Sequence, residues 1–295
     1  MILDFNHSQS KSVLNDIEEE INRQLNTVGI MFRMFARAKT LDSLNKKIEN
    51  DDGYGKSKKI QDLLGIRIVL YFSDDIEIVR DLLKTVYNEL ESDNSIDKHN
   101  ETTFAVTKYN LVYRLSEEET TKLDISNVED IIDNTFELQI RTIFSEGWHE
   151  VEHDLRYKCK SDWEDQKEPS RLLHGVYASL ENSEWTMLKV LDDLSYHHYK
   201  NKNWESMLRQ KFRLKIAQNE LHSSIIDFFD SNIDIAKSIF RVSRSEVILK
   251  RQEVHYPYPD NLTNLVYFIS FYVIKNQQLN SLIPSMMLET LQENN

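Results

Sequence analysis

The sequence predicts an α+β fold: a mixed β-sheet core flanked by helices, followed by an all-helical C-terminal part. Alternating and β-branched runs occur in the first half of the chain, whereas the second half shows only the apolar spacing of helices. Only 6 Gly and 4 Pro occur in 295 residues, so few positions interrupt long helices. We therefore divide the chain into an α+β domain at 1–165 and a helical region at 166–295.

The elements of the first domain follow from changes in apolar period. Leu14, Ile17 and Ile21 recur at helical spacing, whereas MFRMFARAK alternates as a strand does, which puts Arg37 and Lys39 on one face. The predicted elements are a helix at 11–28, a strand at 31–39, a helix beginning after residue 40, a strand at 66–72, a helix at 75–91, a strand at 102–115, a strand at 136–141 and a helix at 142–157. Helices alone follow, at 172–199, 204–229 and 262–292.

Charge and cysteine content limit the class of protein. A net charge of −13 argues against nucleic-acid binding through a broad basic surface, although local basic clusters remain compatible with it. The single cysteine, Cys159, fits a reducing compartment, and the N-terminus has no signal-peptide pattern, so we expect a cytoplasmic protein. The most apolar run, 265–274, is half the ~20 residues that span a bilayer, so we expect a buried helix and no membrane association.

The segment HEVEH at 149–153 matches the zinc-protease pattern H-E-x-x-H. Two histidines four apart on a helix can ligate zinc, with Glu150 as the base on a bound water. A pattern with three fixed positions also occurs by chance in a helix rich in Glu and His. The residues before it favour another interpretation.

Five motifs in order resemble those of RelA/SpoT-type alarmone synthetases, over about residues 30–158. They are R-x-K-x-x-x-S-x-x-x-K at 37–47, D-x-x-G-x-R at 62–67, E-x-Q-x-R-T at 137–142, W-x-E-x-E-H at 148–153 and YK at 157–158. In this family HEVEH is the helix motif A-E-x-E-H, with His149 at the usual small position. The resemblance implies a nucleotidyltransferase-like synthetase core that transfers pyrophosphate from ATP to a nucleotide.

The residue chemistry agrees with this resemblance. Phosphoryl transfer requires cations on the phosphates and a carboxylate-held Mg²⁺, and this acidic chain concentrates its donors on one strand and one helix. The resemblance implies ATP binding by Arg37, Lys39, Ser43, Lys47 and Arg67. It implies Mg²⁺ ligation by Asp62 and Glu137, and we expect Glu137 also to accept the proton of the attacking hydroxyl. We further expect Gln139 and Arg141 to contact the acceptor, and Glu152 and His153 to orient the strand of Glu137.

The acceptor motif of the family is missing. Its pattern G-Y-x-S-x-H aligns with Ala105, Val106, Lys108 and Asn110, so the aromatic ring and the histidine are both absent. Lys108 and Asn110 are the remaining polar candidates for acceptor binding. Nearby lysines at 56, 58 and 59 either close over phosphates or are solvated.

Three functions therefore remain open. The first is transfer of pyrophosphate to the 3′-hydroxyl of a nucleotide, for which a guanosine nucleotide is favoured. The second is a toxic relative that modifies the 3′ end of tRNA, and the third is a catalytically idle nucleotide-binding module. Because an idle relative has no chemical need for both Asp62 and Glu137, the sequence favours an enzyme. The C-terminal helices are expected to bind a regulatory partner or a second copy of the chain.

Overall fold

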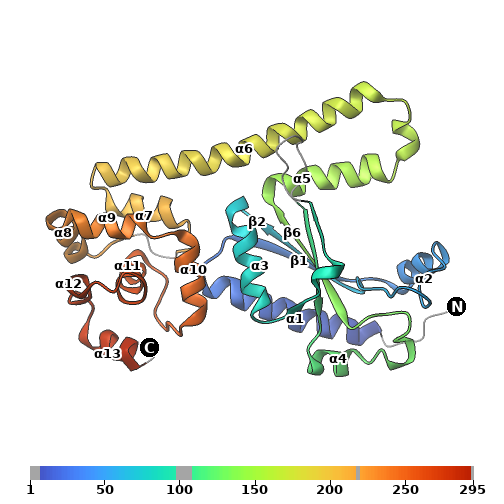
Figure 1. Ribbon diagram of the computed structural model, residues 1–295, viewed down its shortest axis with the longest axis horizontal. Helices are drawn as coiled ribbons and strands as arrows, with labels where there is room; N and C mark the ends of the chain where they lie inside the picture. The colour runs from blue at the N-terminus through green and yellow to red at the C-terminus, as the bar shows by residue number, and fades with distance from the viewer. Residues whose placement is uncertain (1–6, 98–107, 217–219, 294–295) are drawn as a thin grey trace. The chain divides into compact units, whose positions relative to one another are not determined.

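The computed structural model describes residues 7–97, 108–216 and 220–293 of the chain. These residues form a mixed β-sheet with helices around it, followed by helices alone, which confirms the predicted fold class (Figure 1). The chain divides into two compact units, one of residues 1–22 and 32–184 and the other of 23–31 and 185–295. The proposed boundary at residue 165 falls just before a long helix, along which the first unit extends to Glu184.

A six-stranded sheet forms the centre of the first unit. Its strands are β1 (Phe32–Ala38), β2 (Leu64–Leu70), β3 (Asn88–Glu89), β4 (Ser95–Asp97), β5 (Lys108–Arg114) and β6 (Thr135–Thr142). The order is β1-β2-β6-β5-β3, with β4 also paired to β5. Strands β2 and β6 are parallel and the other pairs are antiparallel, so the sheet is mixed as predicted.

The two faces of the sheet differ because side chains alternate along each strand. Ile66 and Ile68 of β2 and Leu138 and Ile140 of β6 are at most 1% exposed. Of the intervening positions, Arg67 of β2 and Glu137 and Gln139 of β6 carry polar side chains that are only half-buried. The apolar face therefore forms the core, and the polar face is available for a site.

Several helices of the first unit begin at a residue whose side chain caps them. They are α1 (His7–Thr27), α2 (Leu41–Glu49), α3 (Ile76–Lys84), α4 (Glu117–Leu123), α5 (Ile143–Glu152) and α6 (Lys167–Lys200), of which α1 and α6 extend into the second unit. Thr40 accepts a hydrogen bond from the backbone N–H of Ser43 and so caps α2. Thr142 and Ser145 form a capping box at α5, which continues as a π-helical turn at His153–Tyr157. A helix from 142 to 157 is thus confirmed, with a change of hydrogen-bonding pattern near its end.

In this unit one predicted helix was too long, and one predicted strand can be compared with the structure only in part. The helix predicted at 75–91 ends at Lys84, and Asn88–Glu89 instead pairs with β5 as an edge strand. Apolar Val86 and Leu90 continue the helical spacing, which is why the period alone did not reveal the end. Of the strand predicted at 102–115, residues 108–114 form β5; the part before 108, with Ala105 and Val106, lies outside the described residues.

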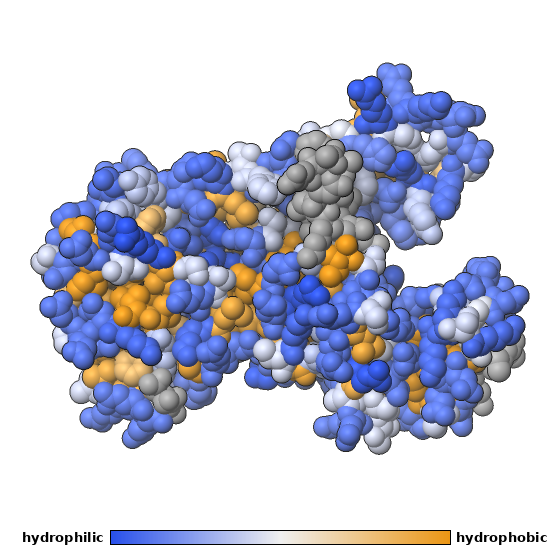
Figure 2. Space-filling view, in the orientation of Figure 1, coloured by the Kyte–Doolittle hydropathy of each residue, from blue (hydrophilic) through white to orange (hydrophobic). Residues whose placement is uncertain are grey.

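The second unit contains further helices around a core of its own. They are α7 (Trp204–Phe212), α8 (Ser223–Ser231), α9 (Ile233–Arg241), α10 (Arg244–Glu253), α11 (Leu262–Phe268), α12 (Gln277–Asn280) and α13 (Ser285–Glu293). Its largest buried side chains include Phe212, Phe229 and Phe268. Figure 2 shows that, on the face drawn, hydrophobic residues gather over these C-terminal helices, whereas the loop between α5 and α6 is hydrophilic.

The helices predicted at 204–229 and 262–292 are each broken. Arg213 adopts a left-handed backbone (φ 46°) that ends α7, and α8 begins ten residues later at Ser223. The apolar run at 265–274 is helical and mostly buried, but Lys275 (φ 52°) ends it before α12. Neither of these two breaks occurs at a Gly or Pro, whereas a further break in the second predicted helix, between α12 and α13, coincides with Pro284. In the described part of the chain, no helix has the length and apolar composition to cross a membrane.

Candidate functional site

The strand register brings the predicted site residues into two rows on the polar face. Gly65 of β2 pairs with Arg37 of β1 and with Glu137 of β6. Two residues further along, Arg67 pairs with Gln139. Because paired residues point to the same face of a sheet, three motifs that are far apart in sequence meet there.

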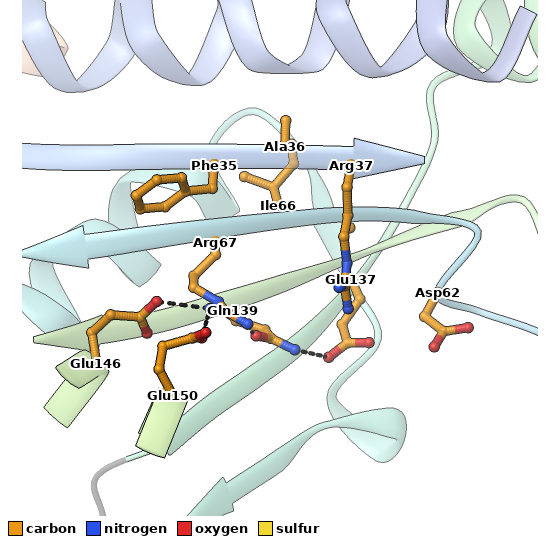
Figure 3. A pocket seen from close by; sticks show the side chains of 11 residues that line it. Phe35, Ala36, Arg37, Asp62, Ile66, Arg67, Glu137, Gln139, Glu146 and Glu150 are labelled. Carbon is orange, nitrogen blue, oxygen red and sulfur yellow. Dashed lines mark hydrogen bonds and ion pairs between the residues drawn. The ribbon is translucent and has the colours of Figure 1, made fainter. Parts of the chain in front are cut away.

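A first cavity of about 480 Å³ lies over these rows (Figure 3). Its volume is within the range of small-molecule sites. It is lined by Phe35, Ala36, Arg37, Asp62, Gly65, Ile66, Arg67, Glu137, Gln139, Glu146 and Glu150. Phe35 is 57% exposed although it is aromatic, and it pairs with Arg67 across β1 and β2. This cavity therefore combines one open aromatic surface with two guanidinium groups.

Asp62 lies just before β2 and is held by two lysines. Lys39 Nζ is 2.5 Å from Oδ2 and Lys47 Nζ is 2.8 Å from Oδ1. Burial alone would raise the pKa of Asp62, but the hydrogen bonds from both lysines outweigh it and hold the pKa below its usual value. The same pair raises the pKa of Lys47: burial alone would lower it, but the hydrogen bond to Asp62 and the charge of Asp62 outweigh burial. Asp62 is therefore an ionised carboxylate inside a cationic pair.

Gln139 connects Glu137 to two arginines. Its Nε2 donates to Glu137 Oε1 at 2.9 Å, while its Oε1 accepts from Arg67 Nε at 3.1 Å and from Arg141 at 3.2 Å. Two donors facing the carbonyl oxygen define the orientation of the amide. Gln139 thus fixes the direction of the Glu137 carboxylate.

Two glutamates of α5, which line the first cavity, pair with the guanidinium groups of Arg67 and Arg141. Arg67 Nη1 is 2.7 Å from Glu146 and 2.5 Å from Glu150, and Arg141 donates to Glu146 at 2.9 Å. Burial would lower the pKa of Arg67, but the two carboxylates raise it. Burial lowers the pKa of Arg141, and the charge of Arg67 adds to this effect. Helix α5 therefore balances the charge of the strand residues.

A second cavity of about 330 Å³ meets the first at Asp62 and Glu137, which line both. Its lining residues are Lys47, Tyr54, Lys58, Lys59, Gln61, Asp62, Asp93, Ser95, Asn110, Val112 and Glu137. Asn110 and Val112 come from β5, and Tyr54, Lys58 and Lys59 come from the loop between α2 and β2. The two carboxylates therefore stand between two neighbouring cavities.

A third cavity, of about 570 Å³, contains the HEVEH segment. His149, Glu152 and His153 line it together with Arg37, Arg67 and Arg141. His153 Nδ1 lies 3.0 Å from Asp154, and its ring stacks on Tyr157 at 5.8 Å between centroids. In 7–97, 108–216 and 220–293, no three His, Cys, Asp or Glu side chains are grouped so as to hold a metal ion.

Most of the predicted site residues line these three cavities. Ser43 and Lys39 do not. The Ser43 hydroxyl lies 2.9 Å from Thr40 Oγ1 in the first turn of α2, and Lys39 is connected to the site by its ion pair with Asp62. Lys108 begins β5, but its side chain is outside the described part of the chain. The sequence analysis missed Phe35, Tyr54 and Glu146, and considered Glu150 only as a zinc-site base. Phe35 shares the alternating face of Arg37, and Glu146 lies one helical turn before Glu150, so both had a detectable signal. The individual roles of all these residues remain predictions.

Fold and geometry together define an α+β domain in which two carboxylates, with lysines and arginines around them, lie between two cavities. Residues 36–162 match the family model described as "Region found in RelA / SpoT proteins". The resemblance predicted from the motifs is therefore confirmed, and this segment is a RelA/SpoT-type region.

Known relatives are similar to parts of the chain. GTP pyrophosphokinase YjbM of Bacillus subtilis (strain 168) is 29% identical over 101 residues, which are 34% of this chain and 43% of that protein. The match thus spans less than half of that relative.

Among solved structures, small alarmone synthetase 1 from Bacillus subtilis bound to its product pppGpp is 21% identical, over 61% of this chain and 92% of that one, with a TM-score of 0.43. A GTP pyrophosphokinase family protein from Streptococcus pneumoniae is 19% identical, over 63% and 91%, with a TM-score of 0.44.

Proposed function

We propose that this chain is a Mg²⁺-dependent pyrophosphokinase that transfers pyrophosphate from ATP to the 3′-hydroxyl of a nucleotide, with a guanosine nucleotide as the favoured acceptor. The observation that carries the proposal is the pair Asp62 and Glu137 at the junction of two cavities within the RelA/SpoT-type region. The name of the YjbM relative and the product bound to small alarmone synthetase 1 both agree with such a reaction.

ATP would occupy the first cavity and the junction. Arg37 and Arg67 line this cavity, and Lys39 and Lys47 surround Asp62 beside it. Charged hydrogen bonds to phosphate oxygens are among the strongest available to a protein, and a triphosphate brings the charge that these four cations require. Ser43, on the same helix as Lys47, is the least supported of the predicted ATP contacts.

The donor set at the junction fits Mg²⁺. Asp62 is ionised by the effect of its lysines, Glu137 is directed by Gln139, and both offer the hard oxygen ligands that Mg²⁺ prefers together with phosphate oxygens. When bound by Asp62 and Glu137, Mg²⁺ would neutralise charge on the phosphates. The lysines that now hold Asp62 would then be free to turn to the triphosphate.

The protein's own groups would supply positioning and one proton acceptor. The acceptor's 3′-oxygen forms a bond to the β-phosphorus while the bond from the β-phosphorus to the oxygen of the α-phosphate breaks, and AMP leaves. Glu137 takes the proton of the hydroxyl. Gln139 holds Glu137, and Arg141 and Asn110 lie close enough to the rows to contact the acceptor, with Lys108 as a further candidate.

Turnover with a panel of acceptors tests the proposal. ATP labelled in the γ-phosphate is incubated with Mg²⁺ and GDP, GTP, GMP, ADP, AMP or bulk tRNA, and AMP release is measured together with the labelled product. We expect label on a guanosine nucleotide. Label on tRNA would select the tRNA-modifying alternative, and ATP binding without AMP release for any acceptor would select the idle module.

The helical region at 166–295 would serve regulation or self-association. Its role as a separate part is supported by the buried core of the second unit, which includes Trp204 and Phe229. Mass measurement by light scattering, with and without nucleotides, distinguishes a monomer from an oligomer. A cytoplasmic location stays a prediction from the sequence.

A further inference from the structure

The second cavity contains an aromatic side chain that the RelA/SpoT motifs do not account for. Tyr54 lines it together with Lys58, Lys59 and Asn110, next to the carboxylates of the junction. An acceptor whose 3′-hydroxyl reaches Glu137 would extend into this cavity. Its base would then lie near Tyr54.

A tight turn presents the ring of Tyr54 at this place. The carbonyl of Gly53 accepts hydrogen bonds from the backbone N–H of Ser57 at 2.9 Å and of Lys58 at 3.1 Å. Gly55 takes a left-handed backbone (φ +75°), where a side chain would be strained and would also meet Ile131 at 3.2 Å. The turn is therefore closed by its own backbone, and Tyr54 is not needed to close it.

The surroundings of the ring suit a nucleotide. Lys58 Nζ lies 4.4 Å and Lys47 Nζ 5.4 Å from the ring centroid. The side chain of Lys58 is 45% exposed and pairs with Asp51, itself 47% exposed, so this ammonium group can turn to a phosphate at little cost. Two ammonium groups thus lie over the ring of Tyr54: that of Lys58, in an exposed ion pair, can leave the ring for a phosphate, whereas that of Lys47 is paired with Asp62.

Asn110 provides an unused acceptor in the same cavity. Its Oδ1 is buried and has no hydrogen-bond partner among the residues that the structure describes. A buried acceptor without a partner is unfavourable, and a donor on a bound base or ribose would remove that cost. Asn110 also faces Gln139 across β5 and β6, so such a donor would lie near the reacting centre.

We propose that Tyr54 is the stacking platform for the purine base of the acceptor nucleotide, with Lys58 and Lys59 on its phosphates and Asn110 as a hydrogen-bond partner. This inference rests on the proposed function and names how its acceptor is held. In the family's acceptor motif G-Y-x-S-x-H, the aromatic position aligns with Val106 of this chain. Tyr54, in the α2–β2 loop, would provide the aromatic ring instead. If Tyr54 only shields Lys47, its loss will weaken ATP binding instead.

Binding, rather than turnover, tests this inference. Calorimetry measures GDP and ADP binding to the full chain in Mg²⁺ with saturating α,β-methylene ATP, so that the ATP cavity is filled. The variants are Tyr54→Ala, Tyr54→Leu, Tyr54→Phe and Tyr54→Trp. Tyr196→Ala, which removes an aromatic side chain 52% exposed on α6 outside the three cavities, is the matched control. Thermal unfolding of each variant reports folding.

We expect Tyr54→Ala and Tyr54→Leu to weaken binding of the preferred diphosphate roughly 5- to 150-fold, corresponding to the ~1–3 kcal/mol of one stacked base. Tyr54→Phe, Tyr54→Trp and Tyr196→Ala should stay within about threefold of the wild type, and affinity for the ATP analogue should not change in any variant.

Three results would overturn the inference: Tyr54→Leu binding as tightly as the wild type, Tyr54→Phe losing as much as Tyr54→Ala, or neither GDP nor ADP binding to the wild type. A different result would contradict the pyrophosphokinase activity alone: no AMP is released with any acceptor of the panel, but GDP still binds and its binding still depends on Tyr54.

Discussion

The two cavities that meet at Asp62 and Glu137 are built differently. The first is lined mainly by residues of β1, β2, β6 and α5. These elements carry the motifs that resemble those of the RelA/SpoT family. The second is lined by the α2–β2 loop and by β5, where the family's acceptor motif is absent. A site formed by paired strands is set by register, whereas a loop can change its residues without disturbing the sheet. The first cavity, the proposed ATP half of the site, can therefore stay constant while the second cavity, the proposed acceptor half, diverges.

The largest expected effect falls on the group shared by both cavities. Glu137→Gln should lower AMP release about 10²- to 10⁴-fold, because the amide can neither accept the proton nor offer a charged ligand. Initial rates with the best acceptor of the panel measure this loss. Glu118→Gln, an exposed position on α4, is the control and should keep the wild-type rate. A Glu137→Gln protein with more than half of the wild-type rate would remove Glu137 from the chemistry.

The next effect separates the ATP half from the acceptor half. Lys39→Met should weaken binding of α,β-methylene ATP roughly 10- to 100-fold, since a hydrogen bond to a charged group contributes ~1.5–3 kcal/mol. GDP binding should change much less. Lys46→Met, an exposed neighbour on α2, should stay within about twofold. If Lys39→Met lowered the affinities for the ATP analogue and for GDP equally, Lys39 would contribute to both binding sites and not to the ATP site alone.

A smaller effect concerns pH. Against the effect of burial, the hydrogen bonds from Lys39 and Lys47 hold the pKa of Asp62 in the folded protein below the ordinary value of about 4 for an aspartate. Its ion pairs therefore stabilise the protein above pH ~4 and are lost as pH falls through the folded pKa. The wild type should therefore be about 1–2 kcal/mol more stable than Asp62→Asn at pH 7, and this difference should shrink below pH 4. Urea unfolding at pH 7, 5, 4 and 3 measures it. A difference that stays constant down to pH 3 would show that the charge of Asp62 is not the source.

The smallest effect is expected at the edge of the first cavity. Glu150 is 55% exposed and Glu146 is 17% exposed, although both pair with Arg67. Glu150→Gln should change ATP-analogue affinity and stability by no more than ~0.5 kcal/mol, or about twofold, as for other exposed ion pairs. Glu146→Gln should cost more, because Arg141 also depends on it. A larger loss for Glu150 than for Glu146 would reverse the assignment of the main counter-ion.

Part of the site could be predicted from the sequence because strand alternation is local. Arg37 on β1 and Glu137, Gln139 and Arg141 on β6 were placed on common faces by period alone, and the register agrees. Helix ends were predicted less well. Three helical segments end without Gly or Pro, at Lys84, Arg213 and Lys275. The first end is set by the pairing of the following residues with β5, and the other two by a left-handed backbone.

The sequence by itself determined the fold class, the order of the motifs and the chemical types of the ATP half, because apolar period and motif spacing are carried by neighbouring residues. Only the tertiary structure decided that Lys39 and Lys47 converge on Asp62, and that Tyr54 and Asn110 share one cavity with Glu137. The residues brought together in this way are up to 83 positions apart (137 − 54 = 83), as are Tyr54 and Glu137, which line one cavity, and their meeting depends on sheet register and on the path of a loop. Neither is encoded in local spacing, so the second cavity, the proposed acceptor half, could be identified only in the tertiary structure.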